Sequence, residues 1–522
     1  RSKPTAMKHG SAYSKLRQSA GSDPVEMKSA PRIQAGLLGA GGLLAIALLA
    51  GRVSGLAREV LLAATFGVSL QADVAVLLLT VPDLLVNILL AGGLSAALVP
   101  RLRGKSDQAA GQLFRRTGGW VVAAFSLIGV FVVAAPEALF AILAPGLPGP
   151  TRIVAGTAIL MVALSIPLTA LSGVSAAYLN AMDKFFVAGT GTLIFNLVVI
   201  SSLLFLPAVN GLLGLTVAIF AGATIRLLSQ VVLLPRSAFD FRGGWGTKDR
   251  AFALAFAAGI AASSFTLLPS ILLRAGASLL GTGNVALFNY AQKLVELPVG
   301  ILITTISTVA LTRLSSQFAE GQEREARQTL VSAVRMALFS AIFVVIFGGL
   351  AADEAATLVF LRGAIVDHEV RQIAILFKIA LFGVPFVAFS SLAAAALNAQ
   401  LRTTQVFRAT AISVALLPIC ALPGLYFSSA TLLMAALVGS QAVLAWLLAR
   451  RAELRLLGSG GVISRQTALA LGAGLVIAAI PVLLIFLAPF QNDLFTLALC
   501  ALGFIAAVAT SLLISKEWAR VR

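Results

Sequence analysis

The sequence predicts an all-α polytopic membrane protein with about 14 transmembrane helices, and three observations lead to this prediction. Hydrophobic residues make up 59% of the chain and charged residues only 11%, whereas soluble proteins carry about 25% charged residues. The apolar sequence divides at charge clusters and Pro/Gly/Asn pairs into stretches near the ~20 residues that a helix needs to cross a bilayer. The positive charge lies mainly in alternate connecting segments, as in a chain that crosses the membrane repeatedly.

The N-terminal segment, residues 1–33, is predicted to be a polar cytoplasmic tail without fixed structure. It carries seven Lys/Arg and no apolar core. A secretory signal peptide would need an apolar segment after its charges and a small-residue cleavage site. The first apolar run, near Ile33, is too long for that role, so we interpret it as the first span.

Fourteen spans are expected from the breaks in hydrophobicity, with boundaries uncertain by several residues. The first, seventh and eighth are long enough to be tilted or kinked. The expected ranges are 34–65, 72–100, 117–143, 152–180, 186–206, 211–235, 251–280, 285–312, 328–351, 371–398, 406–427, 429–449, 466–488 and 494–515.

The connecting segments predict the orientation of the chain, because Lys and Arg in short loops stay on the cytoplasmic side. One alternate set carries 29 Lys/Arg and 11 Asp/Glu, and the other carries 3 and 6. We therefore expect both termini in the cytoplasm, as an even number of spans requires. The basic set is 1–33, 101–116, 181–185, 236–250, 313–327, 399–405 with Arg408, 450–465 and 516–522.

An internal repeat at an offset of about 216 residues predicts the domain organisation. Pro82 aligns with Pro298, and Arg58 aligns with Arg274. Each repeat holds six spans, and because six is even the two halves are related by a pseudo-two-fold axis along the membrane normal. The predicted parts are the tail 1–33, an N-lobe 34–236, a C-lobe 237–450 with the cytoplasmic linker 237–250, and residues 451–522 with two extra spans and the C-terminus.

Ionisable residues inside spans cost at least ~2.5 kcal/mol each at the bilayer centre and are functional candidates by default. Arg335 and Lys378 are expected to extend toward a membrane surface, and Arg226 is partly discounted for the same reason. The other spans hold three acidic candidates and four basic ones. The acidic candidates are Glu59, Asp73 and Glu296, with Asp83 also inside span 2, and the basic ones are Arg52, Arg58, Arg274 and Lys293.

The four basic residues lie on the first two spans of each predicted lobe, which would line the cavity of a two-lobe transporter. Their excess over acids predicts an anionic ligand, and guanidinium groups suit phosphate. Lys293 and Glu296 share a helix face, so an internal ion pair is the alternative interpretation. Arg58 and Glu59 are adjacent and are expected to point apart, so that they do not neutralise each other.

The segment Gly51-Arg-Val-Ser-Gly55 predicts either close helix packing or a hinge. Small residues four apart let helix backbones approach closely. Arg52 and Arg58 are six residues apart, about 120° from alignment on a regular helix. We expect them to converge only if the helix bends near Ser54 and Gly55, as a broken helix lining a cavity would.

No soluble chemistry is visible in the sequence, so an enzyme is not expected. There is no Walker A loop. The two histidines, His9 and His368, have no metal-ligand neighbours, and Cys420 and Cys500 lie in apolar runs. We therefore expect no metal site, no disulfide framework and no cofactor.

Several short motifs lie at separate places along the chain. The opening pattern is carried by Arg52, Gly55, Arg58 and Glu59, then Phe66-Gly67 and Ala72-Asp73. Further along stand Leu143-Ala-Pro-Gly146, Leu179-Asn180 with Phe185 and Asn196, Asn289-Tyr-Ala-Gln-Lys-Leu294 with Glu296-Leu-Pro298, and Leu361-Arg-Gly-Ala364. Together these motifs resemble those of the MurJ/MviN lipid II flippases, a family of the multidrug/oligosaccharidyl-lipid/polysaccharide exporter superfamily. The resemblance covers about residues 34–450, and the fourteen expected spans agree with it.

The resemblance implies a transporter that moves an undecaprenyl-pyrophosphate-linked peptidoglycan precursor, lipid II, from the inner to the outer leaflet. It implies that Arg52, Arg58 and Lys293 hold the pyrophosphate, and that Asp73 and Glu296 occupy acidic positions of the family. Two departures stand out. The family arginines after the span 2 Pro-Asn are absent here, where the sequence reads from Pro82-Asp83 to Asn87, and lysine replaces arginine at Lys293. Asn87 is retained as a polar candidate.

The functional hypothesis is therefore a lipid II flippase that works by alternating access in the bacterial inner membrane. Its expected partners are the lipid-linked glycan, membrane lipids and cell-wall or polysaccharide synthesis machinery, with no nucleic acid. Membrane potential or a monovalent ion would reset the empty cavity, since one charge moved through 100 mV is worth ~2.3 kcal/mol. The alternatives are a flippase for another undecaprenyl-linked oligosaccharide, a non-transporting membrane scaffold, and a cation-coupled drug exporter, which the basic cavity disfavours.

Overall fold

The computed structural model describes residues 30–88, 98–99, 101–103, 105–149, 156–205, 207–239, 264–265, 267–451, 465–487 and 493–515. All regular elements in these ranges are helices, so the predicted all-α class is confirmed. The predicted tail 1–33, the linker 237–250 and the C-terminal segment 516–522 lie almost entirely outside the described residues.

The first half of the chain forms a bundle of long apolar helices. Within it, α7 is largely buried, and small and hydroxyl residues such as Ser165, Ser172 and Gly173 let its neighbours α4 and α9 approach closely. The elements are α1 (Ala30–Phe66), α2 (Leu70–Ile88), α4 (Asp107–Ala134), α5 (Pro136–Leu143), α7 (Gly156–Ala181), α8 (Phe185–Phe205), α9 (Pro207–Val231) and the 3₁₀ helix η2 (Arg236–Phe239).

The second half forms another bundle, beginning in the described residues with a short helix, Leu267–Ser278. Two further helices follow this bundle, and α20 packs on α13 through Phe339, Phe343 and Phe347. The elements are α11 (Asn284–Pro298), the π-helical turn η4 (Val299–Ile303), α12 (Thr304–Ala319), α13 (Glu323–Leu350), α14 (Ala352–Phe360), α15 (Asp367–Leu381), α16 (Val384–Ala399), α17 (Thr403–Tyr426), α18 (Ala430–Arg451), α19 (Arg465–Leu487) and α20 (Asp493–Ser515).

Eleven helices in the described ranges are long and apolar enough to cross a membrane, or twelve if α15 and α16 form one bent span. Three expected spans differ in detail from single straight helices. The range 117–143 divides into α4 and α5 where Pro136 begins a new helix. The range 285–312 contains the turn η4, and 371–398 bends by 42° between α15 and α16. Much of the expected seventh span, 251–263, lies outside the described residues.

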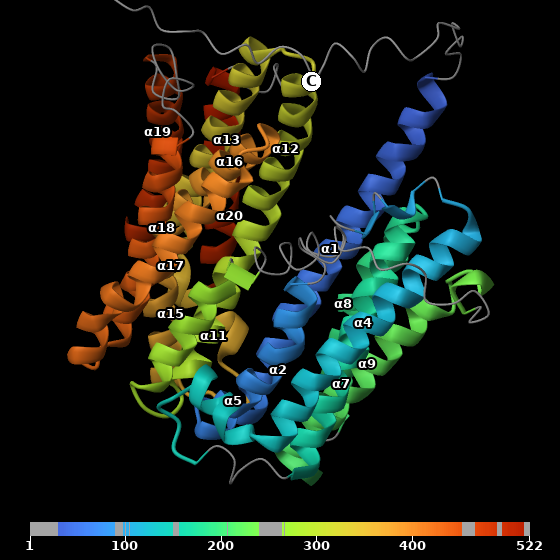
Figure 1. Ribbon diagram of the computed structural model, residues 1–522. Coiled ribbons are helices and arrows are strands. Elements are labelled where there is room, and N and C mark those ends of the chain that lie inside the picture. Colours follow the sequence, from blue (N-terminus) through green and yellow to red (C-terminus); the bar gives the residue numbers. More distant parts are fainter. Residues whose placement is uncertain are drawn as a thin grey trace, which may run out of the picture.

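The two bundles converge at one end and lie apart at the other (Figure 1). They meet at the lower end of the view, where α1 ends and α2 and α11 begin, and diverge toward the upper end, where α12 and the start of α1 lie. The repeat appears in the backbone here, because Gly67 and Gly283 precede α2 and α11 and both have positive φ, 64° and 85°. Glycine adopts this conformation without the steric penalty of other residues.

The end at which the bundles meet is built from close backbone contacts, which we call the lobe contact. Ala364 donates its N–H to the carbonyl of Ala64 at 2.8 Å, and Gly146 donates its N–H to Ser278 Oγ at 3.0 Å. A Cβ on Gly146 or Gly363 would overlap the backbone of the other bundle. The lobe contact comprises Ala64, Gly67, Asp73, Gly146, Ser278, Gly283, Gly363 and Ala364.

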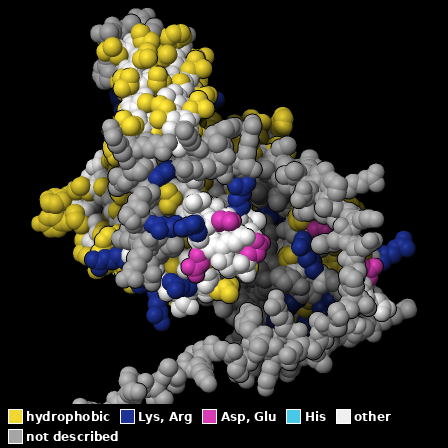
Figure 2. All heavy atoms as spheres, turned by 90° about the horizontal axis from the view of Figure 1, so that it is seen from above, with side chains coloured by type: hydrophobic (Ala, Val, Ile, Leu, Met, Phe, Trp, Pro, Cys, Tyr) yellow, Lys and Arg dark blue, Asp and Glu magenta, His cyan; other side chains and the backbone are white. Residues whose placement is uncertain are grey.

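The opposite end of the molecule carries many Lys and Arg side chains, with some Asp and Glu side chains among them (Figure 2). This is the face onto which the diverging ends of the bundles open. The assignment of lobes to 34–236 and 237–450 remains a prediction, and so does the assignment of this face to the cytoplasm.

Candidate functional site

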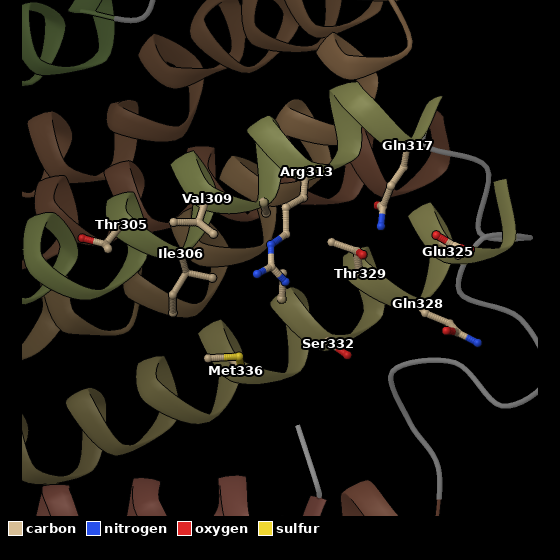
Figure 3. Close-up of a pocket in the computed structure, with 12 residues that line it drawn as sticks. Thr305, Ile306, Val309, Arg313, Gln317, Glu325, Gln328, Thr329, Ser332 and Met336 are labelled. Atoms are coloured by element: carbon tan, nitrogen blue, oxygen red, sulfur yellow. The ribbon is translucent and has the colours of Figure 1, made fainter. Parts of the chain in front are cut away.

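Two cavities bear on function, and they differ in charge. One, of about 440 Å³, lies between α12 and α13 (Figure 3), where Arg313 is the single basic side chain among its lining residues. The other, of about 470 Å³, lies between the two bundles and carries several charged side chains. The second cavity, called here the central cavity, is therefore the candidate site.

The central cavity brings together all four basic residues expected from the sequence. Arg52 and Arg58 reach it from α1, Lys293 from α11, and Arg274 from the helix Leu267–Ser278. Three further candidates also line it, namely Gly55, Asn87 and Glu296. This clustering depends on the meeting of the two bundles, since α1 and α11 belong to different halves of the chain.

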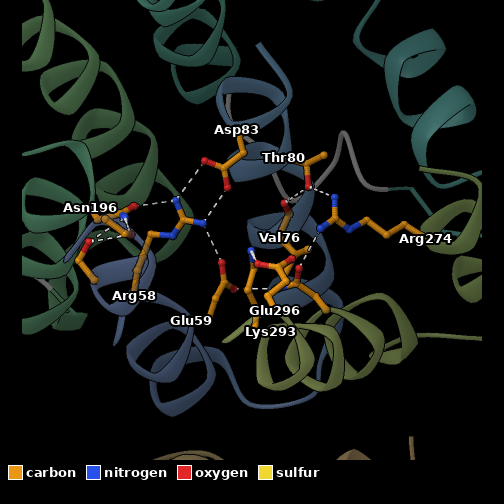
Figure 4. A network of polar contacts seen from close by, with 12 residues as sticks. Arg58, Glu59, Val76, Thr80, Asp83, Asn196, Arg274, Lys293 and Glu296 are labelled. Atoms are coloured by element: carbon orange, nitrogen blue, oxygen red, sulfur yellow. Dashed lines mark hydrogen bonds and ion pairs between the residues drawn. The ribbon is translucent and has the colours of Figure 1, made fainter. Parts of the chain in front are cut away.

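Arg58 contacts two carboxylates, which corrects the expectation that Arg58 and Glu59 point apart (Figure 4). Its Nη2 lies 2.8 Å from Glu59 Oε1 and 2.8 Å from Asp83 Oδ2, and its Nη1 lies 3.4 Å from Asp83 Oδ1. The adjacent side chains meet because the long arginine side chain can fold back beside its own helix. Asn196 Oδ1 accepts a further hydrogen bond from Nη1 at 3.1 Å.

A chain of hydrogen bonds links Arg58 to Arg274 in the other bundle. Glu59 Oε2 accepts a hydrogen bond from Asn289 Nδ2 at 2.7 Å, and Asn289 Oδ1 accepts one from Arg274 Nη2 at 3.0 Å. Arg274 Nη1 donates to Thr80 Oγ1 of α2 at 3.0 Å. The two arginines that align in the repeat are thus joined across the interface between the bundles.

Arg274 differs from Arg58 in its electrostatic surroundings. None of its hydrogen bonds in the described part of the chain goes to a carboxylate, and its Nε has no partner there. Arg274 therefore keeps a positive charge that neighbouring acids do not directly neutralise.

Lys293 forms an ion pair with Glu296, as the alternative interpretation of this pair requires. Lys293 Nζ lies 2.8 Å from Glu296 Oε2, and the side chains are 18% and 59% exposed. Both residues nevertheless line the central cavity. The glutamate is accessible enough to move away, so the pair does not remove Lys293 from the candidate site.

Arg52 lies against the π-helical turn η4 of the other bundle. A Cβ at Gly300 would overlap the Arg52 guanidinium, so the absence of a side chain at Gly300 provides the space that Arg52 occupies. No ion pair joins Arg52 to another described residue. Arg52 and Arg274 are thus the two cations of the central cavity that no described carboxylate contacts directly.

The segment around Ser54 and Gly55 packs against α8. Asn196 Nδ2 donates to Gly51 O at 3.1 Å and to Ser54 Oγ at 3.0 Å, and Gly51 lies close to Thr192. α1 is helical from Ala30 to Phe66. A broken helix is therefore not needed for Arg52 and Arg58 to line one cavity, contrary to the expectation, and a hinge at this point stays a prediction.

Asp73 lies outside the central cavity, in the lobe contact. It is fully buried, and its carboxylate accepts the N–H groups of Gly283 at 2.6 Å and Ala286 at 2.8 Å. These N–H groups belong to the first turn of α11, which favours a negative charge. Asp73 therefore joins the bundles by capping a helix of the other half.

Two basic residues that were discounted have different positions from those expected. Arg335 is only 5% exposed within α13, so its side chain is enclosed by protein. Arg226 is also buried, and its Nε donates to Ser172 Oγ at 2.9 Å inside the first bundle. Lys378 pairs with Asp353 at 2.5 Å in an exposed position, as expected for a residue near a helix end.

Sequence reasoning placed Asp83 inside span 2 without a partner, and it gave no role to the polar partners Thr80, Asn196 and Asn289. Asp83 carried a usable signal, because an acid beside Pro82 within a span is costly unless it has a partner. Asn196 and Asn289 appeared only as motif letters. Their roles depend on which helix faces which, and the spacing along one helix does not contain that information.

The central cavity has the chemistry of an anion site. Guanidinium and ammonium groups converge on it from both bundles, and arginine can bind phosphate with two parallel hydrogen bonds. Across the part of the chain that the structure describes, no cluster of three or more His, Cys, Asp or Glu side chains could hold a metal ion.

Comparison with known proteins places this architecture in a family. The family model described as lipid II flippase MurJ matches residues 62–504. A Vibrio cholerae protein named probable lipid II flippase MurJ is 27% identical over 364 residues, which cover 64% of this chain and 67% of that protein.

Solved structures show the same fold. A structure described as lipid II flippase MurJ in an inward closed conformation has a TM-score of 0.78 at 20% identity, covering 91% of this chain and 99% of that one. An inward-facing multidrug resistance transporter of the MATE family, in the MOP superfamily, has a TM-score of 0.67 at 14% identity. The match covers 78% of this chain and 94% of the transporter chain.

Proposed function

The chain belongs to the lipid II flippase MurJ family, and from that membership we propose that it carries lipid II from the inner to the outer leaflet by alternating access. The chain is a multi-pass membrane protein. We propose that it resides in the bacterial inner membrane with both termini in the cytoplasm, and that it is a transporter without enzymatic activity.

The observation that carries this proposal is the basic central cavity between the two bundles. Arg52, Arg58, Arg274 and Lys293 line a space of about 470 Å³, and a diphosphate is the part of lipid II that such groups bind best. Away from bulk water these attractions are stronger than at a protein surface. The polyprenyl tail would stay in the lipid while the headgroup enters the cavity.

The proposed loading direction follows from the lobe contact. The bundles meet at the end opposite the basic face, so the state described here is closed toward the outside if that basic face is cytoplasmic (Figures 1 and 2). Lys and Arg excess on the cytoplasmic side supports this orientation. Rocking of the lobes would then open the lobe contact and release the headgroup outward. The cycle uses no cofactor, and membrane potential or a monovalent ion would drive the return.

A flipping assay in proteoliposomes tests the proposal directly. Fluorescent lipid II is placed in the inner leaflet, and its appearance in the outer leaflet is measured with an impermeant quencher. We expect transport by the wild type and at least about a tenfold loss for Arg274→Gln, because one charge-assisted contact contributes ~1.5–3 kcal/mol. Arg103→Gln is the matched control, since Arg103 pairs with Asp183 in an exposed position. Transport of lipid II at the protein-free rate would refute the proposal.

A second candidate is a flippase for another undecaprenyl-linked oligosaccharide. It is favoured by one departure of the site, the acidic Asp83 beside Arg58 in the stretch of span 2 where family members carry arginines. The same assay separates the two, because a pyrophosphate-linked glycan with a different sugar would be transported faster than lipid II. A non-transporting scaffold would be indicated instead if Arg58→Glu with Lys293→Glu left function in cells intact.

A further inference from the structure

Asp83 and Arg58 form a pair whose geometry resembles that of a guanidinium bound to a phosphate. The two carboxylate oxygens of Asp83 face the two terminal nitrogens of Arg58, at 2.8 and 3.4 Å (Figure 4). Phosphate oxygens take the same two positions when arginine binds them in a bidentate manner. Arg58 therefore cannot bind a diphosphate in this way until Asp83 moves.

The second carboxylate on Arg58 is held differently. Glu59 is buried, and its other oxygen accepts a hydrogen bond from Asn289 of α11. The Asp83 side chain is 36% exposed, and Arg58 is its hydrogen-bond partner in the described part of the chain. Of the two acids, Asp83 is the one better able to leave, because its described hydrogen bonds go to Arg58, whereas Glu59 is also held by Asn289.

From these contacts we propose that Asp83 is an internal anion that takes the place of the substrate diphosphate on Arg58 whenever the cavity is empty. This inference rests on the proposed function. An arriving diphosphate first meets Arg52 and Arg274, which no described carboxylate contacts, and then displaces Asp83 from Arg58. After release, Asp83 returns to Arg58. The emptied cavity thus regains the second carboxylate on its most buried cation before the lobes reorient.

The pair has two measurable consequences for transport. Because Asp83 competes for Arg58, the apparent affinity for the diphosphate is lowered by the fraction of time that Arg58 is free. Removing the carboxylate should therefore tighten binding while slowing turnover. The product is released more slowly, and the empty cavity returns with one negative charge fewer beside its four cations. A residue with a merely structural role would weaken both binding and turnover when replaced.

The variant Asp83→Asn tests the first consequence. It keeps the shape of the side chain and one acceptor oxygen, and Arg58 retains Glu59 and Asn196. We expect undecaprenyl pyrophosphate in detergent to bind this variant about tenfold more tightly than the wild type. This is the gain expected if Asp83 leaves Arg58 free for about a tenth of the time in the wild type. In proteoliposomes the KM should fall while kcat falls severalfold. Asp83→Glu, which keeps the charge, should bind like the wild type.

The matched control is Asp183→Asn, the same chemical change at an exposed acid that pairs with Arg103. It should leave binding and transport unchanged. Thermal unfolding of each variant checks that it is folded. Equal or weaker binding by folded Asp83→Asn would overturn the inference, as would tightening by the control to the same extent.

Carboxyl labelling of the unmodified protein provides a measurement that needs no variant. A carbodiimide with a small amine labels accessible carboxylates, and mass spectrometry reports each site. Undecaprenyl pyrophosphate should increase labelling of Asp83 and not of Asp183, whereas undecaprenol should change neither. Binding without increased labelling of Asp83 refutes the internal anion alone, while absence of binding of undecaprenyl pyrophosphate refutes the proposed function itself.

Discussion

Arg58 and Arg274 occupy equivalent positions in the repeat but have opposite electrostatic surroundings. Arg58 contacts the carboxylates of Glu59 and Asp83, whereas Arg274 donates to neutral partners, Thr80 and Asn289. Removing a buried charge matters most when it leaves opposite charges without a partner. The two arginines should therefore differ in what they contribute to folding and to binding.

Arg58→Ala is expected to destabilise the protein by about 3–5 kcal/mol, because it leaves buried Glu59 without its cation. Arg274→Ala is expected to cost only about 1 kcal/mol, since hydrogen bonds between helices in a membrane are individually weak. Both should lose most of their affinity for undecaprenyl pyrophosphate. Thermal unfolding in detergent, with binding measured in parallel, checks the contrast. Equal losses of stability would show that the paired carboxylates do not depend on Arg58.

The sequence located the cations of the central cavity because charge within an apolar span is conspicuous whatever its neighbours are. It did not predict which acidic side chains pair with these cations. Adjacent residues on a helix point about 100° apart, which suggested that Arg58 and Glu59 separate, but the length of the arginine side chain lets them meet at 2.8 Å. Asp83 joins them from α2, and its position depends on how α1 and α2 are rotated relative to each other.

At the scale of a single element, the turn η4 determines where Arg52 lies. Gly300→Ala would place a methyl group in the space of the Arg52 guanidinium, while alanine itself favours the helix by about 1 kcal/mol over glycine. We expect unchanged or higher thermal stability together with weaker binding of undecaprenyl pyrophosphate. The matched control is Gly349→Ala in α13, where an added Cβ meets no neighbour within 4 Å. Unchanged binding by Gly300→Ala would exclude Arg52 from the diphosphate site.

The first turns of α2 and α11 are joined by Asp73, so this acid should favour the state in which the lobe contact is closed. Asp73→Ala removes an acceptor from the N-terminus of α11, a loss of about 0.5–2 kcal/mol. Because the contact exists only while the bundles meet, the population should shift toward the open state by about 2- to 30-fold, since ~1.4 kcal/mol is tenfold. Distances between spin labels on either side of the lobe contact measure the shift, and an unchanged distribution would contradict it.

At the scale of the whole molecule, the sequence predicted the helical class and the repeat because the lengths of apolar stretches and the aligned prolines and arginines can be read along the chain. It did not predict the lobe contact. Gly146 belonged to a recognised motif, but its closeness to Ser278 depends on the arrangement of the two bundles. The contact follows the repeat, since the glycine loops of the two halves, at Gly146 and Gly363, each pack on the end of a first helix of the other half.

The alternating-access cycle requires the lobe contact to open, and a disulfide across it should stop transport. A Cβ at Gly67 would lie 3.4 Å from Ala364 Cβ, close to the ~3.5–4.5 Å of a disulfide. We expect Gly67→Cys with Ala364→Cys, in a background without Cys420 and Cys500, to lose lipid II flipping on oxidation and regain it on reduction. The positive φ of Gly67 will cost about 1–2 kcal/mol for cysteine, so the reduced double variant and each single variant are the controls. Flipping at the reduced rate by fully oxidised protein would mean that the substrate crosses without opening of this contact.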